Sequence, residues 1–267
     1  MTFALDVSRE NAKFWNVPCG TSSAAALGVY DKSRESLRTF DEWFFNFYPY
    51  LDSYIPYADM RGKRVLEVGL GYGSVGQKIA EAGADYTGLD IAPGPVGLML
   101  HRLAANGLKG RAFIGSILDA PCPDASVDYI VAIGCYHHTG DMQKAIDESY
   151  RLLRPGGRLI LMVYNGLSYR QWCRRPWVTL RYAVTGRTSI ATKSMIAEYD
   201  DRNGVAAPHT DFVSRATLRR YCSKFVAFRA RLENISSEPP FRYSRERLLK
   251  TMWPKVVGLD IYATATK

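Results

Sequence analysis

The sequence contains no stretch that approaches the about 18 uncharged apolar residues of a membrane-spanning helix. Its first residues, MTFALDVSRENAKF, lack the basic start and the apolar core of a secretory signal peptide. The five cysteines are scattered and form no C-x-x-C pair, which argues against a structural zinc site and a disulfide framework. We therefore predict a cytoplasmic protein with reduced thiols, no membrane span and no bound metal.

The two halves of the chain carry net charges of opposite sign: basic residues are in the minority in the first half, and acidic residues are scarce in the second. Residues 1–150 hold 13 Lys and Arg against 18 Asp and Glu, whereas residues 151–267 hold 22 against 8. A basic half attracts an anionic substrate, a nucleic acid or a membrane surface, but it serves equally well as a solvated face. Charge alone therefore leaves the partner open.

A glycine-rich loop stands between a predicted strand and a predicted helix. Residues 64–68, RVLEV, form an apolar run with the β-branched content of a buried strand, and residues 74–82 space their apolar side chains as a helix does. Gly69, Gly71 and Gly73 alternate with larger residues between them. A strand, a glycine loop and a helix in this order offer backbone N–H groups to a nucleotide-like ligand.

Two carboxylates help to identify the nucleotide that this loop would bind. Asp90 ends the next predicted strand, residues 85–89, at about the distance expected of a ribose-binding acid, which by itself permits an NAD enzyme. Glu67 lies two residues before Gly69, where it would repel a pyrophosphate but suit a cationic ligand.

Strands and helices alternate along the middle of the chain. Further strands are predicted at residues 111–114, 127–133 and 158–163, with helices at 95–105 and 141–153 and a turn at 155–157. Beyond an Arg-rich segment without an obvious strand, a helix is predicted at 214–222 and strands at 225–232 and 256–264. The pattern predicts an α/β fold with a Rossmann-like, doubly wound, mostly parallel seven-stranded sheet and an antiparallel pair at one edge.

Four regions follow from this pattern. They are an N-terminal helical cap (1–60), a nucleotide-binding core (61–163), a mainly helical insertion (164–224) and the closing strands (225–267). Within the cap, aromatic helices are predicted at 31–40 and 41–57. Residues 14–21, where aromatic residues adjoin Pro and Gly, are a candidate lid over a ligand.

Four motifs in order show a resemblance to a known family. VLEVGLGYG, YTGLDIA, APCPDASVDYIV and RLLRPGGRL resemble successive motifs of class I S-adenosylmethionine-dependent methyltransferases, in particular the small-molecule type 11/25-like branch. The resemblance implies S-adenosyl-L-methionine as the cofactor. It places Glu67 near the ammonium group, the three glycines along the methionyl part, Asp90 on the ribose hydroxyls and Ile91 against adenine. Ser116 and Ile117 stand where the family often has Asp-Ala, and Gly134 and Cys135 would line the reacting methyl group.

The turn after the fourth strand supplies candidates for catalysis. His137 and His138 stand where a general base would reach an acceptor, although either also suits a helix cap or a turn. Tyr136 and Tyr164 are predicted to contact the acceptor.

The leading hypothesis is transfer of a methyl group to an O, N or S atom of a small molecule. The acceptor pocket would form between the cap and the insertion. An acidic acceptor is suggested by Arg170, Arg174, Arg175, Arg181 and Arg187, and a pocket without arginine would argue against it. RNA methylation, an NAD-dependent oxidoreductase and a non-enzymatic binding protein remain as alternatives, and a homodimer is left open.

Overall fold

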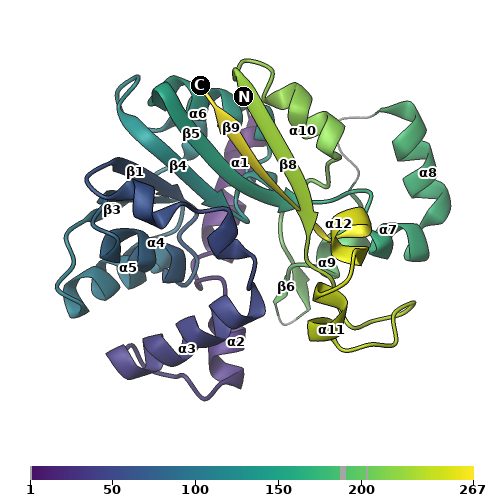
Figure 1. Ribbon diagram of the computed structural model, residues 1–267, viewed down its shortest axis with the longest axis horizontal. Coiled ribbons are helices and arrows are strands. Elements are labelled where there is room, and N and C mark those ends of the chain that lie inside the picture. The colour runs from purple at the N-terminus through teal and green to yellow at the C-terminus, as the bar shows by residue number, and fades with distance from the viewer. Residues whose placement is uncertain (1, 187–190, 203) are drawn as a thin grey trace.

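A seven-stranded sheet lies at the centre of the computed structural model, which describes residues 2–186, 191–202 and 204–267 (Figure 1). Its strand order is β3-β2-β1-β4-β5-β9-β8. The strands are β1 (Arg64–Val68), β2 (Asp85–Asp90), β3 (Arg111–Ile114), β4 (Val127–Ile133), β5 (Leu153–Tyr164), β8 (Ala227–Glu233) and β9 (Asp260–Thr266). The first five are parallel, and β9 runs antiparallel to both β5 and β8. The predicted Rossmann-like sheet is confirmed.

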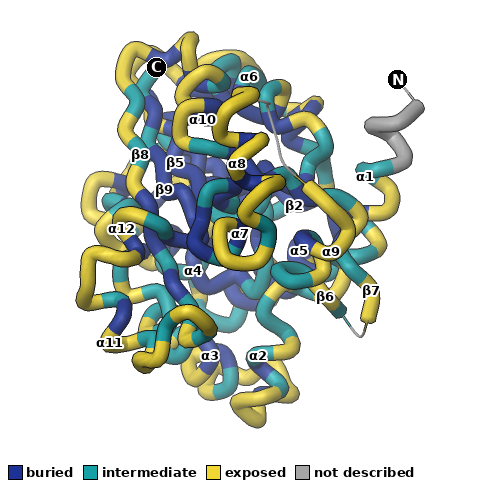
Figure 2. The backbone as a smooth tube through the Cα atoms, turned by 90° about the vertical axis from the view of Figure 1, so that its right-hand side faces the viewer, coloured by how far each residue is buried: buried dark blue, intermediate teal, exposed yellow. Residues whose placement is uncertain are grey.

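Helices cover both faces of this sheet. On one face lie α4 (Ser74–Glu81) and α5 (Pro93–Ala105), and on the other α6 (Met142–Leu152) and α10 (Arg215–Tyr221). Successive residues of a strand point to opposite faces, so Ile160 of β5 packs with the α4 side while Leu161 packs with the α6 side. Figure 2 shows β5 and β9 as largely buried backbone in the interior of the molecule.

The N-terminal region is helical, with boundaries that differ from the prediction. Its helices are α1 (Thr2–Phe14), α2 (Thr21–Ala26), α3 (Arg34–Phe47) and the 3₁₀ turns η1 (Leu51–Ser53) and η2 (Tyr57–Met60). Helix α3 runs through the predicted break at residue 40, and it begins where Ser33 Oγ accepts a hydrogen bond from the backbone N–H of Ser36. It ends at Phe47 because Pro49 disfavours a helical conformation at Tyr48, so the predicted helix to residue 57 is wrong.

The insertion holds α7 (Tyr169–Arg174), α8 (Pro176–Thr185), α9 (Lys193–Ala197) and a small hairpin of β6 (Asp201–Arg202) and β7 (Val205–Ala206). Helix α8 stands at the right-hand side of Figure 1, and the backbone of α7–α9 is largely exposed in Figure 2. The sequence showed no strand here because two-residue strands carry no periodic pattern. Arg187 lies outside the described residues.

The bounds of the last three strands of the sheet, β5, β8 and β9, also differ from the prediction. Strand β5 begins at Leu153 and includes the predicted 155–157 turn, because the backbone N–H of Gly156 bonds Lys267 O at 2.8 Å and that of Lys267 bonds Gly157 O at 2.9 Å. Between β8 and β9 lie α11 (Arg245–Leu249) and α12 (Trp253–Val257), so the last strand starts at Asp260 rather than Val256. Among the described residues, no helix has the length and apolar composition that crossing a membrane requires.

Candidate active site

One cavity of about 310 Å³ opens at the carboxyl ends of β1, β2 and β4. The carboxyl ends of parallel strands meet at one edge of a sheet, which is why residues far apart in sequence converge there. All the predicted cofactor-binding residues line this cavity: Glu67, Gly69, Gly71, Gly73, Asp90, Ile91, Ser116, Ile117, Gly134 and Cys135. His138 and Tyr164 line it as well.

The glycine loop approaches its neighbours too closely for a side chain. Gly69 has φ +80°, and a Cβ added there would lie 2.5 Å from Cβ of Cys135. Both the left-handed backbone and the close approach therefore require glycine. The loop backbone therefore packs against the turn that follows β4. The loop also lines the cavity, where its backbone is open to a ligand.

Asp90 is held by the backbone on both sides of the cavity. Its Oδ2 accepts a hydrogen bond from the N–H of Leu70 at 2.8 Å, and its Oδ1 accepts one from Ala92 at 2.9 Å. Burial raises the pKa of this carboxyl to about 6. Each oxygen keeps a lone pair, so the carboxylate is fixed in place and still able to accept hydrogen bonds from a diol.

Glu67 is more deeply buried and is paired with a phenol. Its Oε2 accepts a hydrogen bond from the hydroxyl of Tyr86 at 2.5 Å, and only 3% of the residue is exposed. Burial raises the pKa of this carboxyl to about 8. The side chain is therefore mainly uncharged at neutral pH until a cation approaches it.

The far end of the cavity is apolar. Ile117 is 3% exposed, and Ser116 Oγ accepts a hydrogen bond from the N–H of Leu118 at 3.1 Å, capping the turn η3 (Ile117–Asp119). The hydroxyl proton of Ser116 remains available to a ligand. Ile91 lies on the same cavity wall, so this end suits a flat base.

His138 is oriented through one ring nitrogen. Its Nδ1 lies 2.9 Å from the carbonyl oxygen of His209 and 3.2 Å from Oγ1 of Thr210. Because a carbonyl oxygen only accepts, Nδ1 carries the proton in the neutral ring and Nε2 has the free lone pair. Burial lowers the pKa of the imidazole. His138 is thus set as a neutral proton acceptor at the cavity wall.

The structure does not bring His137 or Tyr136 to the cavity. Both belong to the one-turn helix η4 (Tyr136–His138), in which successive side chains point in different directions. Tyr136 is wholly buried in the core, with its hydroxyl 2.6 Å from Oγ of Ser149, so its expected contact with the acceptor is wrong. His137 is also wholly buried, and its ring packs 4.1 Å from that of Tyr164, so of the two predicted histidines His138 alone lines the cavity.

The other half of the cavity has an aromatic wall. Its aromatic residues are Trp15, Phe40, Trp43, Phe44, Tyr48, Tyr164 and Tyr262. Trp15 and Cys19 come from the candidate lid, residues 14–21, and Cys19 lies beside the glycine loop. The lid is tied to the insertion by Arg202 Nη1, which donates hydrogen bonds to the carbonyl oxygens of Phe14 and Val17 at 2.7 and 2.6 Å.

Asp200 also lines this half of the cavity, and no motif or spacing in the sequence predicts it. The residue stands just before a two-residue strand in the insertion, with no motif around it. Its Oδ1 accepts a hydrogen bond from the hydroxyl of Tyr164 at 3.0 Å, and its Oδ2 lies 3.8 Å from Nε2 of His138. The structure therefore joins one predicted acceptor residue and one predicted base through a carboxylate that was not predicted.

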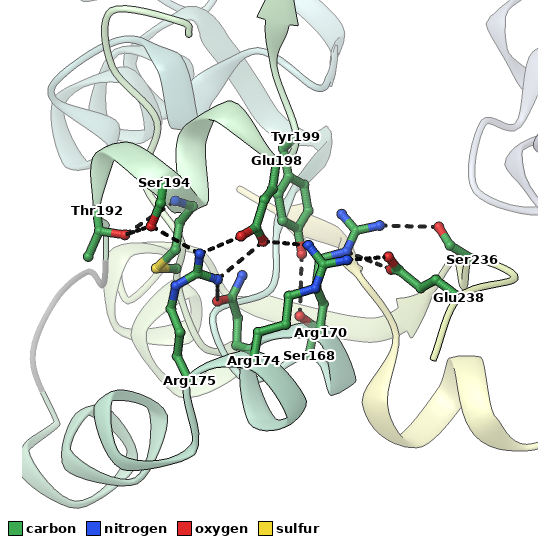
Figure 3. A network of polar contacts seen from close by, with 12 residues as sticks. Ser168, Arg170, Arg174, Arg175, Thr192, Ser194, Glu198, Tyr199, Ser236 and Glu238 are labelled. Carbon is green, nitrogen blue, oxygen red and sulfur yellow. Dashed lines mark hydrogen bonds and ion pairs between the residues drawn. The ribbon is translucent and has the colours of Figure 1, made fainter. Parts of the chain in front are cut away.

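Among the arginines of the insertion that the structure describes, none lines the cavity. Among the described residues that line it, none is a lysine or an arginine. Arg174 forms ion pairs with Glu198 at 3.0 Å and with Glu238 at 2.6 Å, Arg170 pairs with Glu238 at 2.7 Å, and Arg175 pairs with Glu198 (Figure 3). These charges bind the insertion together and to the segment after β8. They give no support to the expected acidic acceptor.

Domains that bind S-adenosylmethionine typically combine a Rossmann-like sheet and a glycine-rich loop with an acidic residue near the end of each of the first two strands. Glu67 of β1 and Asp90 of β2 stand at these positions. Residues 66–161 match the family model described as a methyltransferase domain. The demethylmenaquinone methyltransferase of Thermus thermophilus is 31% identical over 133 residues, covering 46% of this chain and 60% of that protein. The ubiquinone biosynthesis O-methyltransferase of Pseudomonas entomophila is 29% identical over 110 residues, covering 40% and 47%.

A solved structure agrees over a longer span. An S-adenosylmethionine-dependent methyltransferase of Methanosarcina mazei superposes with a TM-score of 0.57 at 17% identity, covering 82% of this chain and 97% of that one. The chain spans roughly half the length of the curated relatives it matches, 60% and 47% of the two above. The resemblance to S-adenosylmethionine-dependent methyltransferases that the four motifs predicted is thus confirmed over residues 66–161 of the chain.

Proposed function

We propose that this protein transfers a methyl group from S-adenosylmethionine to an O, N or S atom of a small, uncharged molecule with an aromatic or otherwise apolar body. The observation that carries the proposal is that one cavity combines the cofactor residues with an aromatic wall, without a lysine or arginine among its described lining residues. An acceptor with a full negative charge would leave that charge unpaired in a buried site.

The residues of the first half fit the cofactor. S-adenosylmethionine supplies a methyl group that is already activated by a positively charged sulfur. Asp90 would accept the ribose hydroxyls, and the loop from Gly69 to Gly73 would lie along the amino-acid part, where the carboxyl of Glu67 meets the ammonium group. Gly134 and Cys135, beside this loop, would border the methyl group. The protein's work is then to position the acceptor and exclude water.

The residues of the second half come from the cap (1–60) and the insertion (164–224), with Tyr262 from β9. The lid residue Trp15 packs its ring 4.7 Å from that of His138, which brings the cap against the catalytic turn. Two relatives are named for demethylmenaquinone and for ubiquinone biosynthesis. A small acceptor with an aromatic or apolar body fits an aromatic wall.

Two measurements test the proposal. Equilibrium titration should show binding of S-adenosylhomocysteine and none of NAD, and Asp90→Ala should weaken that binding at least ~100-fold, since it removes both ribose hydrogen bonds. Incubation with methyl-labelled cofactor and a pool of small aromatic compounds should then give a product one methyl group heavier. Transfer of label only to anionic compounds, or tight binding of NAD, would refute the proposal.

A further inference from the structure

Asp200 is a buried carboxylate on the acceptor side of the cavity, away from the cofactor residues. Its side chain is 9% exposed, and Oδ1 is fixed by the hydroxyl of Tyr164 at 3.0 Å. Its Oδ2 has no hydrogen-bond partner among the residues that the structure describes. A buried carboxylate oxygen without a partner is costly, so its retention beside a cavity calls for a role.

A basic nitrogen, Nε2 of His138, lies near Oδ2 and also lacks a hydrogen bond within the described part of the chain. Nε2 of His138 lies 3.8 Å away and forms no hydrogen bond with any described residue, while Nδ1 is held by the carbonyl of His209. A neutral imidazole and a carboxylate at this separation are not directly bonded. Once Nε2 gains a proton, the pair becomes a buried ion pair with strong attraction.

We propose that His138 removes the proton from a hydroxyl group of the acceptor and that Asp200 acts through His138, as the carboxylate that stabilises the resulting imidazolium. This assignment rests on the proposed function and narrows its acceptor to a phenol-like hydroxyl compound. A neutral amine attacks with its own lone pair and needs no base beforehand, whereas a hydroxyl is a weak nucleophile until its proton leaves.

The step balances without any further reactant. The O–H bond of the acceptor breaks as its proton moves to Nε2, its oxygen bonds to the methyl carbon, and the C–S electron pair stays on a sulfur that becomes a neutral thioether. The imidazolium then returns the proton to water as the product leaves. Asp200 takes no part in these bond changes, and the hydroxyl of Tyr164 fixes its carboxylate beside the ring.

The groups around His138 and Asp200 determine how the activity is expected to change with pH. His137, His209 and Asp211 also face His138, and Asp200 is faced in addition by Tyr164, Arg202, Thr210, Cys19 and Asp260. Burial lowers the pKa of His138, and the charge of Asp200 raises it in part. Activity that needs the neutral ring therefore rises with pH through this pKa, and loss of the carboxylate moves the rise to lower pH.

The closing experiment compares Asp200→Asn and His138→Gln with wild type, and with Asp201→Asn as the matched control. Asp201 is exposed, and its Oδ1 accepts a hydrogen bond from Gly204 that asparagine preserves. Histidine NMR titration follows the imidazole of His138 directly. We expect its pKa to fall in Asp200→Asn, because the charge that raises it is lost, and to stay unchanged in the control.

The same proteins are assayed with labelled cofactor and matched sets of phenols, anilines and thiophenols. We expect methylation of the phenols, a loss of ~100-fold or more in kcat for His138→Gln, and a smaller loss with an acid-shifted profile for Asp200→Asn. S-adenosylhomocysteine affinity should change less than about twofold in both variants. Methylation of anilines or thiophenols alone, no methylation of any compound, or an unshifted pKa would overturn the inference. Failure of wild type to bind S-adenosylhomocysteine would instead refute the proposed function.

Discussion

Replacing Glu67 by glutamine should stabilise the ligand-free protein, by an amount that grows with pH. Glutamine closely matches a protonated glutamate, and its amide oxygen still accepts the hydroxyl of Tyr86, which now bonds Oε2 at 2.5 Å. The pKa of Glu67 is about 8 in the folded chain against 4.5 as the ordinary value, because the carboxyl is buried. Only the wild-type protein must therefore bury a charge as the pH rises.

The magnitude follows from that difference. A group whose pKa is raised by folding contributes its full stability below its unfolded pKa and loses it as the pH rises through the folded one. Each unit corresponds to about 1.4 kcal/mol, so wild type should lose on the order of 4 kcal/mol relative to Glu67→Gln between about pH 4 and pH 9. Other buried carboxyls, such as Asp90, are present in both proteins and cancel.

Urea unfolding, followed by tryptophan fluorescence at about pH 5, 7 and 9, measures this difference directly. The control is Glu81→Gln, which removes an exposed carboxylate from the last residue of α4. If the two variants showed the same pH dependence, or if Glu67→Gln were destabilised equally at every pH, Glu67 would not be a buried acid. Cofactor binding gives a second test of Glu67. Wild type should release close to one proton on binding at pH 7, and Glu67→Gln should release none. The proton release is measured as a binding enthalpy that depends on the buffer.

Three further substitutions test other parts of the site. Gly69→Ala should abolish S-adenosylhomocysteine binding in titration, since the new Cβ would lie 2.5 Å from Cβ of Cys135, whereas Gly97→Ala, which meets nothing within 4 Å, should bind normally. Arg202→Ala should raise the acceptor KM ~10-fold in steady-state kinetics with cofactor affinity nearly unchanged, because it frees the lid; an equal loss of both would contradict this. Arg175→Ala should lower Tm by about 2–4 °C in a thermal scan and leave the acceptor KM unchanged. An altered KM would indicate that Arg175 contributes to acceptor binding after all.

The sheet and the cofactor half were predictable because their signals are local. Strands β1, β2 and β4 each end in a residue that lines the cavity. Gly69 has a left-handed backbone with φ +80°, and Asp90 accepts a hydrogen bond from the N–H of Ala92 two residues further on. The predicted bounds of β1, β3 and β4 agree with the structure residue for residue. Backbone geometry of this kind leaves a recognisable spacing in the sequence.

The acceptor half was not predictable in the same way. Asp200 reaches His138 only because a short hairpin folds back over the turn after β4, and nothing within ten residues of either one signals the meeting. The error over Tyr136 has the same origin, since the direction of each side chain in a one-turn helix depends on what packs around it. Such contacts are set by tertiary packing rather than by local preference.

The hold of Arg202 on the lid is made through main-chain oxygens, those of Phe14 and Val17, which every amino acid carries. The position of the lid is therefore largely independent of which side chains it bears. Residues of the lid that line the cavity, such as Trp15, can be exchanged for others while the anchoring hydrogen bonds persist. A change of acceptor can in this way be reached through the lid's side chains, one substitution at a time, with the closure of the pocket and the cofactor loop kept as they are.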